Sequence, residues 1–584
     1  MVAEVSRSPV SALRPVIVTS AVVVAVIASA VVSEVRPAAL FDPAARAAVA
    51  DFVRGLFPPD LSPGFAWTVA VAAVRTIAIA VVGTALSVIV GLPLGILGTA
   101  TLFRRGTLVE GTPPSAGGRL LAAASVVARV VLGGLRAVPD LVWAMFFVVG
   151  VGLGSTAGVL ALGVSYGGVL GRVLAHLFED VDPRPLEALL ATGATRSQIF
   201  VFGIWPQARS SAVAYALYSV ECCMRAAAVL GLVGAGGIGY EIALSMRLFE
   251  YRQIATLVAA LIALVWLGDA CSAALRRALR ANAPPGMLGH LRARPGRSHR
   301  ATGALALVAA AVAACTAALW DGGGFDAAAA SHMARFARGL FPPELDPGYL
   351  RTLVRPVAQT LGISVIGTLL GAALGAVLGI AATAAHAEDD RGRGATGLAR
   401  TAVRRLCRTV LSLMRAIPEL LWALVFIIAV GLGPFAGALA LGVHTGGVLG
   451  KLYADTLEEV SPLPLRGLRA TGAAPLPILV WGAWPEARRT LVSYTVLRWE
   501  MNLRTSTVVG LAGGGGIGVE LYNSLQLGFY SRVAVLILVV GALIGATEWI
   551  GDQLRRRLDA SGQHARRARR RAAAIDALTA EAAP

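Results

Sequence analysis

Residues 136–144 read Arg-Ala-Val-Pro-Asp-Leu-Val-Trp-Ala, and residues 415–423 repeat them as Arg-Ala-Ile-Pro-Glu-Leu-Leu-Trp-Ala. Each copy begins with a cation, contains a proline and then runs into a long apolar block. A block of roughly 18 or more apolar residues is long enough to cross a bilayer as a helix. The pair therefore indicates a duplicated chain built from membrane-spanning helices.

Apolar residues dominate the composition. Of the 584 residues, 56% are hydrophobic and only 15% are charged, whereas a soluble domain carries about a quarter charged residues. The blocks cover residues 16–32, 76–102, 141–170, 211–240 and 254–267, and Glu221 and Arg225 interrupt the fourth. A soluble protein would have to bury all of them on every side, so we predict an all-α integral membrane protein.

The basic residues indicate the orientation in the membrane. The formal charge is +18, which could also suit a nucleic-acid-binding protein, but no aromatic-interleaved basic stripe occurs. The arginines instead cluster between apolar blocks or at the chain ends: Arg7 and Arg14, 104–105, 276–280, 292–300, 404–408, 555–557 and 566–571. This is typical of cytoplasmic loops, so we expect a lipid bilayer and no nucleic acid as partner.

The remaining pairs of matching segments extend the duplication over most of the chain. Residues 52–60, 167–171 and 236–239 recur in order as residues 336–344, 446–450 and 515–518. We predict a first unit at 1–275, a basic cytoplasmic linker at 276–300, a second unit at 301–555 and a basic cytoplasmic tail at 556–584. The block at 16–32 could be a signal peptide, but its counterpart at 304–319 lies in mid-chain, which favours a retained first span.

Each half is predicted to hold about six spans. Their centres are expected near residues 24, 82, 145, 165, 222 and 262, and near 311, 370, 425, 442, 500 and 540. An even number places both termini and the linker on one side, which their arginines identify as cytoplasmic. The two Phe-Pro-Pro segments then lie outside the cytoplasm.

A loop between the fourth and fifth spans of the first half carries its own helix signals. Asp182 can cap a helix whose first turn tolerates Pro183 and Pro185. Its apolar face comprises Leu186, Leu189 and Leu190. Gly193 stops or bends this helix, and a second short helix is expected to run to Pro206.

The residues Glu187-Ala188, Gly193 and Ile204-Trp-Pro206 in this loop resemble the EAA signature of ABC importer permeases. The resemblance implies a coupling helix that docks on a cytoplasmic ATPase; an ordinary amphipathic connector is the alternative. The second half keeps the scaffold residues Gly472 and Pro485 but has Arg466-Gly467 in place of Glu187-Ala188. Pro475 and Pro477 are expected to break its second helix, which suggests that the two halves grip the ATPase unequally.

Further motifs narrow the resemblance. Phe-Pro-Pro-Asp, Arg-Ala-Ile-Pro-Glu-Leu-Leu-Trp-Ala and the stretch 498–507 running into the glycines at 510–518 resemble the phosphonate-type permeases. This resemblance implies two tandem type-I permease units in a bacterial inner membrane, a cytoplasmic ATP-binding subunit acting as a dimer, and an extracytoplasmic substrate-binding protein. The implied cargo is phosphonate or a related oxyanion such as phosphite.

Charged residues inside predicted spans form a second candidate site. An ionisable residue at mid-bilayer costs roughly 2.5–3.5 kcal/mol, so it usually faces a partner or a water-filled path. Glu221 and Arg225 in the first half, and Glu500 and Arg504 in the second, are four apart and can pair on one helical face. Together with Arg498 and Asn502 they either fix helix packing or line the translocation pathway.

No catalytic, cofactor or metal motif is found. Walker loops need Gly-Lys followed by Ser or Thr, but Leu452 follows Gly450-Lys451. The cysteines at 222, 223, 271, 315 and 407 lack metal-ligand spacing, and the glycines at 231–239 and 510–518 are expected to break helices or allow close helix contact. We expect a permease subunit without its own ATPase site; the alternatives are an ion-gradient transporter and an ABC permease for another solute.

Overall fold

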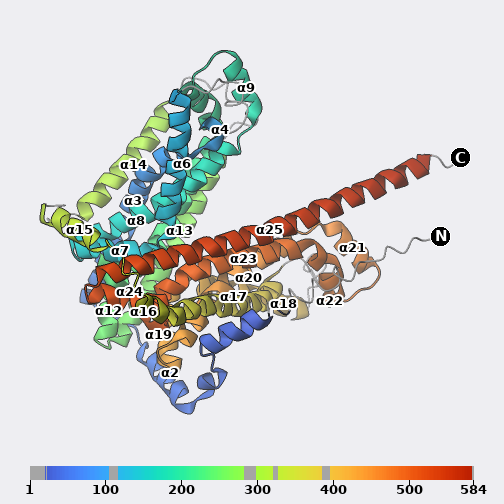
Figure 1. Cartoon of the computed structure of the whole chain (residues 1–584). Coiled ribbons are helices and arrows are strands. Elements are labelled where there is room, and N and C mark those ends of the chain that lie inside the picture. Colours follow the sequence, from blue (N-terminus) through green and yellow to red (C-terminus); the bar gives the residue numbers. More distant parts are fainter. Residues whose placement is uncertain are drawn as a thin grey trace. The chain divides into compact units, whose positions relative to one another are not determined.

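The computed structural model describes residues 20, 23–103, 116–281, 298–319, 327–383 and 395–581. Every regular element in these ranges is helical (Figure 1), as the all-α prediction requires. Arg7, Arg14, the arginines at 104–105 and most of the predicted linker lie outside the described residues.

Among the residues that the structure describes, eight helices are long and apolar enough to cross a membrane, or up to nine if one bent pair counts as a single span. The eight fall on α3 (Pro63–Gly98), α6 (Ala116–Ala137), α8 (Ser155–Glu179), α11 (Trp205–Leu230), α13 (Tyr251–Ala281), α17 (Val354–Ala382), α20 (Pro434–Glu458) and α25 (Tyr530–Glu581). The bent pair is α18 (Ala395–Ala416) and α19 (Glu419–Val430), which meet at 94°. The span predicted near residue 500 is α23 (Trp484–Val509), whose charges keep it out of this set.

The third span of the first half was predicted in the wrong place, and that of the second half covers only part of a bent pair. The helices near residues 145 and 425 are α7 (Asp140–Val151) and α19, and each has only 12 residues. At 1.5 Å per residue such a helix covers about 18 Å, which is less than the roughly 30 Å of bilayer core. Pro139 and Pro418 begin these short helices because a proline cannot continue the preceding ladder of hydrogen bonds. In the first half the long helix α6 takes the third place, and in the second half α18 and α19 are apolar enough for a span only together, as the bent pair.

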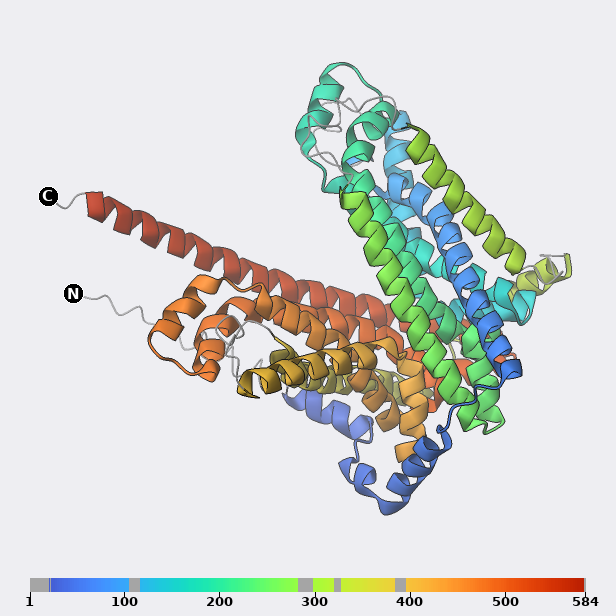
Figure 2. The same ribbon diagram turned by 180° about the vertical axis from the view of Figure 1, so that it is seen from behind.

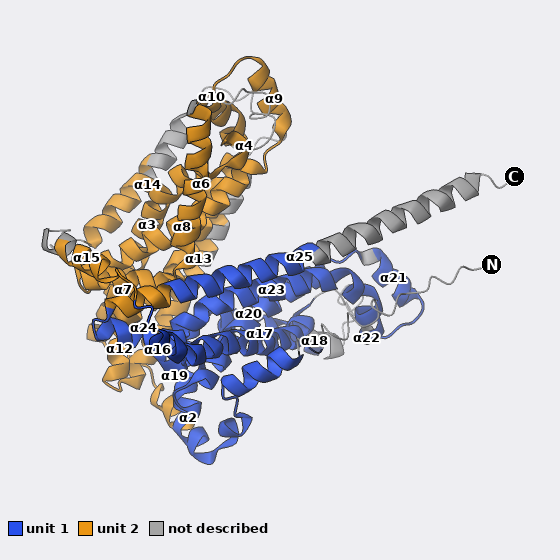
Figure 3. Ribbon diagram, in the orientation of Figure 1, with its two compact units in different colours: residues 1–49, 344–529, 538–584 blue, residues 50–343, 530–537 orange. Residues whose placement is uncertain are grey.

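The contacts form two compact units that do not coincide with the sequence repeats. One unit holds residues 1–49, 344–529 and 538–584, and the other holds 50–343 and 530–537 (Figure 3). Each unit thus contains the first segment of the other repeat. The boundaries at 1–275 and 301–555 therefore remain predictions about the repeat in the sequence.

The N-terminal helix packs inside the unit of the second repeat. Arg355 of α17 forms an ion pair with Glu34 at 3.2 Å. A Cβ atom on Gly362 would lie 2.5 Å from Ser33 Oγ, so α17 and the N-terminal helix are in close contact there.

The reciprocal packing occurs in the other unit. Helix α14 (Ser298–Ala318) packs along α3 (Figures 1 and 2). Phe336 of α15 (Ala327–Gly339) lies with its ring 5.0 Å from that of Phe146 on α7. The first helices are therefore exchanged between the repeats.

Glycines bring the central helices of each unit together. A Cβ atom on Gly91 of α3 would lie 2.7 Å from the Gly167 oxygen of α8. On α17, a Cβ atom on Gly375 would lie 2.8 Å from the Gly450 nitrogen of α20. Small residues allow such close backbone approach between membrane helices.

The helix break predicted at the glycine runs 231–239 and 510–518 is confirmed. After α11 the chain passes Gly234 at φ +102° and Gly236 at φ +80°, and then enters α12 (Gly237–Arg247). The Ile238 N–H donates to Thr76 Oγ1 of α3 at 2.9 Å. The second repeat matches this contact, with Ile517 N–H donating to Thr360 Oγ1 at 2.8 Å.

Candidate functional site

The loop after α8 folds as the sequence predicts for its first helix. Helix α9 (Pro183–Ala191) is capped by the Asp182 carboxylate, which accepts from the Arg184 N–H at 3.1 Å. It ends at Ala191, and Gly193 just after it has a φ of +78°, which favours glycine. Thr195 and Gln198 then form a reciprocal cap at the start of α10 (Arg196–Gln198).

The expected end of the second helix at Pro206 is wrong. Helix α10 continues through the wide turn η2 (Ile199–Ile204) into α11, where Pro206 is the second residue. The wide turn ends just before Pro206, whose nitrogen cannot donate a hydrogen bond. Because the wide turn changes the hydrogen-bond pattern there, the chain stays helical through the proline. The loop at 182–206 is thereby joined to α11 without a break.

Helix α9 lies with its leucines against the bundle. Leu186 is 5% exposed and belongs to a cluster with Phe103, Phe178 and Ile204. Gly203 makes room for it, because a Cβ atom there would lie 2.6 Å from Leu186 Cδ2. Glu187 and Ala188 are exposed on the opposite face, where a second protein can reach them.

The loop of the second half has the same shape. Helix α21 (Pro462–Ala470) ends at Gly472 with φ +77°, and a Cβ atom on Gly482 would lie 2.8 Å from Leu465 Cδ2. Arg466 and Gly467 are exposed where Glu187 and Ala188 stand in the first half.

The predicted break at Pro475 and Pro477 is wrong. Residues Pro475–Pro477 form α22, which continues through η6 (Ile478–Ala483) into α23, with Pro485 as its second residue. Both prolines lie in the first turn, where a backbone N–H has no partner within the helix. The first N–H after them, that of Ile478, reaches Ala474 O at 3.2 Å.

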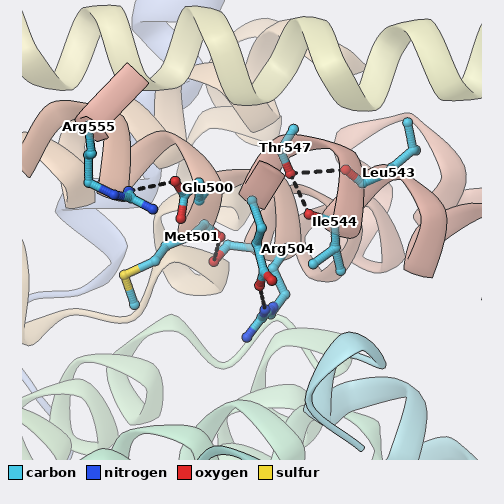
Figure 4. Close-up of polar contacts among 9 residues, drawn as sticks. Glu500, Met501, Arg504, Leu543, Ile544, Thr547 and Arg555 are labelled. Carbon is cyan, nitrogen blue, oxygen red and sulfur yellow. Dashed lines mark hydrogen bonds and ion pairs between the residues drawn. The ribbon is translucent and has the colours of Figure 1, made fainter. Parts of the chain in front are cut away.

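The intramembrane charges pair differently in the two halves. Arg225 donates to Glu221 at 3.1 Å within α11, as predicted. The predicted pairing of Glu500 with Arg504 is wrong, because each of the two residues pairs with a side chain of α25 instead. Glu500 accepts from Arg555 at 2.6 Å (Figure 4), and Arg504 donates to Glu548 at 3.2 Å. Glu548 and Arg555 are seven residues apart, or about two helical turns, so both can face α23.

Asn502 is buried between helices and connects them through hydrogen bonds. It is fully buried, its amide donates to Thr368 Oγ1 at 2.8 Å, and its oxygen accepts from Thr445 Oγ1 at 3.0 Å. It thus joins α23 to α17 and α20 and has no surface for a solute in this conformation. Arg498 lies near Met501, with 3.9 Å between its Nη1 and the sulfur.

Glu548 and Arg555 were not predicted as partners from the amino-acid sequence. One signal was present, because Asp269 and Arg276 stand at the aligned positions of the first half. Their side chains lie outside the described ones. An acidic and a basic residue at the same two positions in the last span of both halves would have indicated that α25 supplies the partners.

Comparison with known proteins gives a consistent result. Residues 118–282 and 394–560, more than half of the chain, match the model of the "binding-protein-dependent transport system inner membrane component" family. The phosphate-import permease protein PhnE of Mycolicibacterium smegmatis is 31% identical over 75% of this chain and 78% of its own length. The phosphite transport system permease protein PtxC of Stutzerimonas stutzeri is 34% identical over 38% of this chain and 77% of its own length.

Solved structures give a weaker likeness. The inward-facing MetNI methionine ABC transporter covers 37% of this chain and 99% of its own, at 20% identity and a TM-score of 0.33.

Proposed function

Because the chain belongs to the family of inner-membrane components of binding-protein-dependent transport systems, as a fused tandem duplicate, we propose that it forms the membrane channel of an ATP-driven importer of a phosphorus oxyanion. The observation that carries this proposal is the loop 182–206. Its helix α9 is held on the bundle by Leu186 and presents Glu187 outward.

The two loops are the contacts with the ATPase in this proposal. They fold alike but display opposite charge, Glu187 in one and Arg466 in the other. Each loop docks on one subunit of a cytoplasmic ATP-binding dimer, and the opposite charges let the two contacts differ in strength. Both termini are then cytoplasmic, and the Phe-Pro-Pro segments face the substrate-binding protein.

The cargo class follows from the relatives' names. The two relatives are named for phosphate import and phosphite transport. Both ions share the tetrahedral phosphorus centre of a phosphonate. Arg225 and Arg504 have side chains 26% and 30% exposed, each beside a carboxylate. As pathway residues they attract the anion, while Glu221 and Glu548 keep the binding weak enough for release.

Uptake of labelled methylphosphonate, phosphite and phosphate tests the proposal, in cells that lack their own systems and express this chain with its ATPase and binding protein. We expect uptake of at least one of the three, its loss when the ATPase is inactive, and a larger loss for Glu187→Arg than for Arg466→Glu. Uptake without an ATPase would indicate an ion-driven transporter. Uptake of none of the three by an assembled, ATP-hydrolysing complex would refute the cargo class, and equal losses for the two variants would refute the unequal grip.

A further inference from the structure

A repeated ion pair lies where each coupling loop leaves the bundle. We propose that Arg129 and Arg408 are positioning residues that transmit movement of the coupling loops to the ends of α3 and α17. This proposal rests on the function proposed above, since it requires an ATPase that moves the loops.

In the first half the pair joins three helices. Arg129 of α6 pairs with Glu179, the last residue of α8. The Arg129 Nε–H also donates to Gly98 O, the last residue of α3, at 2.5 Å. Glu179 accepts in turn from the Ala100 N–H at the start of α4 (Ala100–Phe103), at 2.6 Å. One arginine and one carboxylate therefore bind the ends of α3 and α8 to α6.

The second half repeats this arrangement with its own residues. Arg408 of α18 pairs with Glu458, the last residue of α20. Its Nε–H donates to Ala382 O, the last residue of α17, at 3.0 Å. Two of the three contacts, the ion pair and the bond to the last carbonyl of the preceding helix, thus form in both halves, although α6 is apolar and α18 is rich in arginine.

The position of the pair suits transmission from the loop. Glu179 is three residues before Asp182, which caps α9. Phe103 of α4 packs in the same cluster as Leu186 of α9. The loop is therefore connected to α4 twice, through apolar packing and through the hydrogen bond from Ala100, so a displacement of α9 is passed to the end of α3.

Arginine suits this position better than lysine. The last carbonyls of a helix lack partners within the helix. The planar guanidinium can donate to the Gly98 carbonyl and the Glu179 carboxylate at once, in a fixed geometry, whereas a lysine ammonium offers a flexible point charge.

The pair is exposed enough to be tested without unfolding the chain. The side chains of Arg129 and Glu179 are 34% and 20% exposed, and those of Arg408 and Glu458 are 47% and 29% exposed. Ion pairs of this kind contribute little to the free energy of unfolding. A large functional loss on removal would therefore report transmission rather than stability.

The test uses the full chain with its ATPase and binding protein in proteoliposomes. Arg129→Gln, Arg408→Gln and Arg129→Lys are compared with Arg172→Gln, an exposed arginine of α8. The readouts are cargo transported per ATP hydrolysed, stimulation of ATPase activity by loaded binding protein, and the thermal midpoint of the complex.

We expect both Gln variants to lower transport per ATP by about fivefold or more, the lower end of typical coupling effects. Their thermal midpoint should stay close to that of the wild type, Arg129→Lys should restore only part of the loss, and Arg172→Gln should behave as the wild type. Unchanged transport per ATP in the Gln variants, or a loss that follows the amount of assembled complex, would overturn the inference. A wild type that neither transports nor responds to the ATPase would instead overturn the proposed function.

Discussion

Replacing Leu186 with alanine should detach α9 from the bundle. Leu186 is 5% exposed and packs with Phe178, Ile199 and Ile204. Truncating a buried leucine costs about 2–5 kcal/mol. A helix of nine residues is not stable alone in water, so this cost falls on the docking of α9.

A loss of about 2 kcal/mol, the lower end of this range, corresponds to a roughly 30-fold rise in the population of the undocked loop, at about 1.4 kcal/mol per tenfold change. Hydrogen exchange of residues 183–195 in nanodiscs measures this population. Leu465→Ala should act in the same way on the second loop, because Leu465 is also 5% exposed. Leu463→Ala is the control, since Leu463 is 78% exposed.

The exchange of α8 and α11 should stay unchanged, and transport should fall although the exposed Glu187 is intact. If α9 in the Leu186→Ala variant exchanges no faster than in the wild type, the packing account of the loop is refuted. Equal effects of Leu463→Ala and Leu465→Ala would refute it as well.

Two further changes test the packing of the second-repeat unit. Asn502→Ala removes hydrogen bonds to Thr368 and Thr445 and should lower the free energy of unfolding by about 1–2 kcal/mol; Asn523→Ala, at an exposed position, is the control, and an equal loss in both would contradict the junction. Gly362→Leu should separate the N-terminal helix from α17, because a Cβ atom there would lie 2.5 Å from Ser33 Oγ; overpacking of this kind costs about 1–3 kcal/mol. A disulfide cross-link engineered between Val32 and α17 should form less readily in this variant than in Gly541→Leu, where nothing lies within 4 Å of the added Cβ, and equal cross-linking would argue against the exchanged packing.

Local features of the loop at 182–206 could be predicted because their causes are local. The Asp182 cap, the leucine face of α9 and the turn at Gly193 each depend on residues within one or two turns of the chain. The effect of proline was harder to predict. The sequence predicted helix breaks at Pro206, Pro475 and Pro477. Pro206 follows a wide turn, and the other two prolines lie in a first turn, so none of them interrupts its helix.

The amino-acid sequence by itself determined the helical class, the membrane location and the duplication, because apolar block length and repeated segments are properties of the chain alone. It could not place the third span of the first half, since the apolar block at 141–170 runs through the break at Gly152–Gly154 between α7 and α8. Only the tertiary structure decided that Glu500 and Arg504 pair with α25 and that the first helices are exchanged between the repeats. Both depend on which helix face meets which neighbour, and a bilayer-spanning apolar helix carries little amphipathic pattern to show that face.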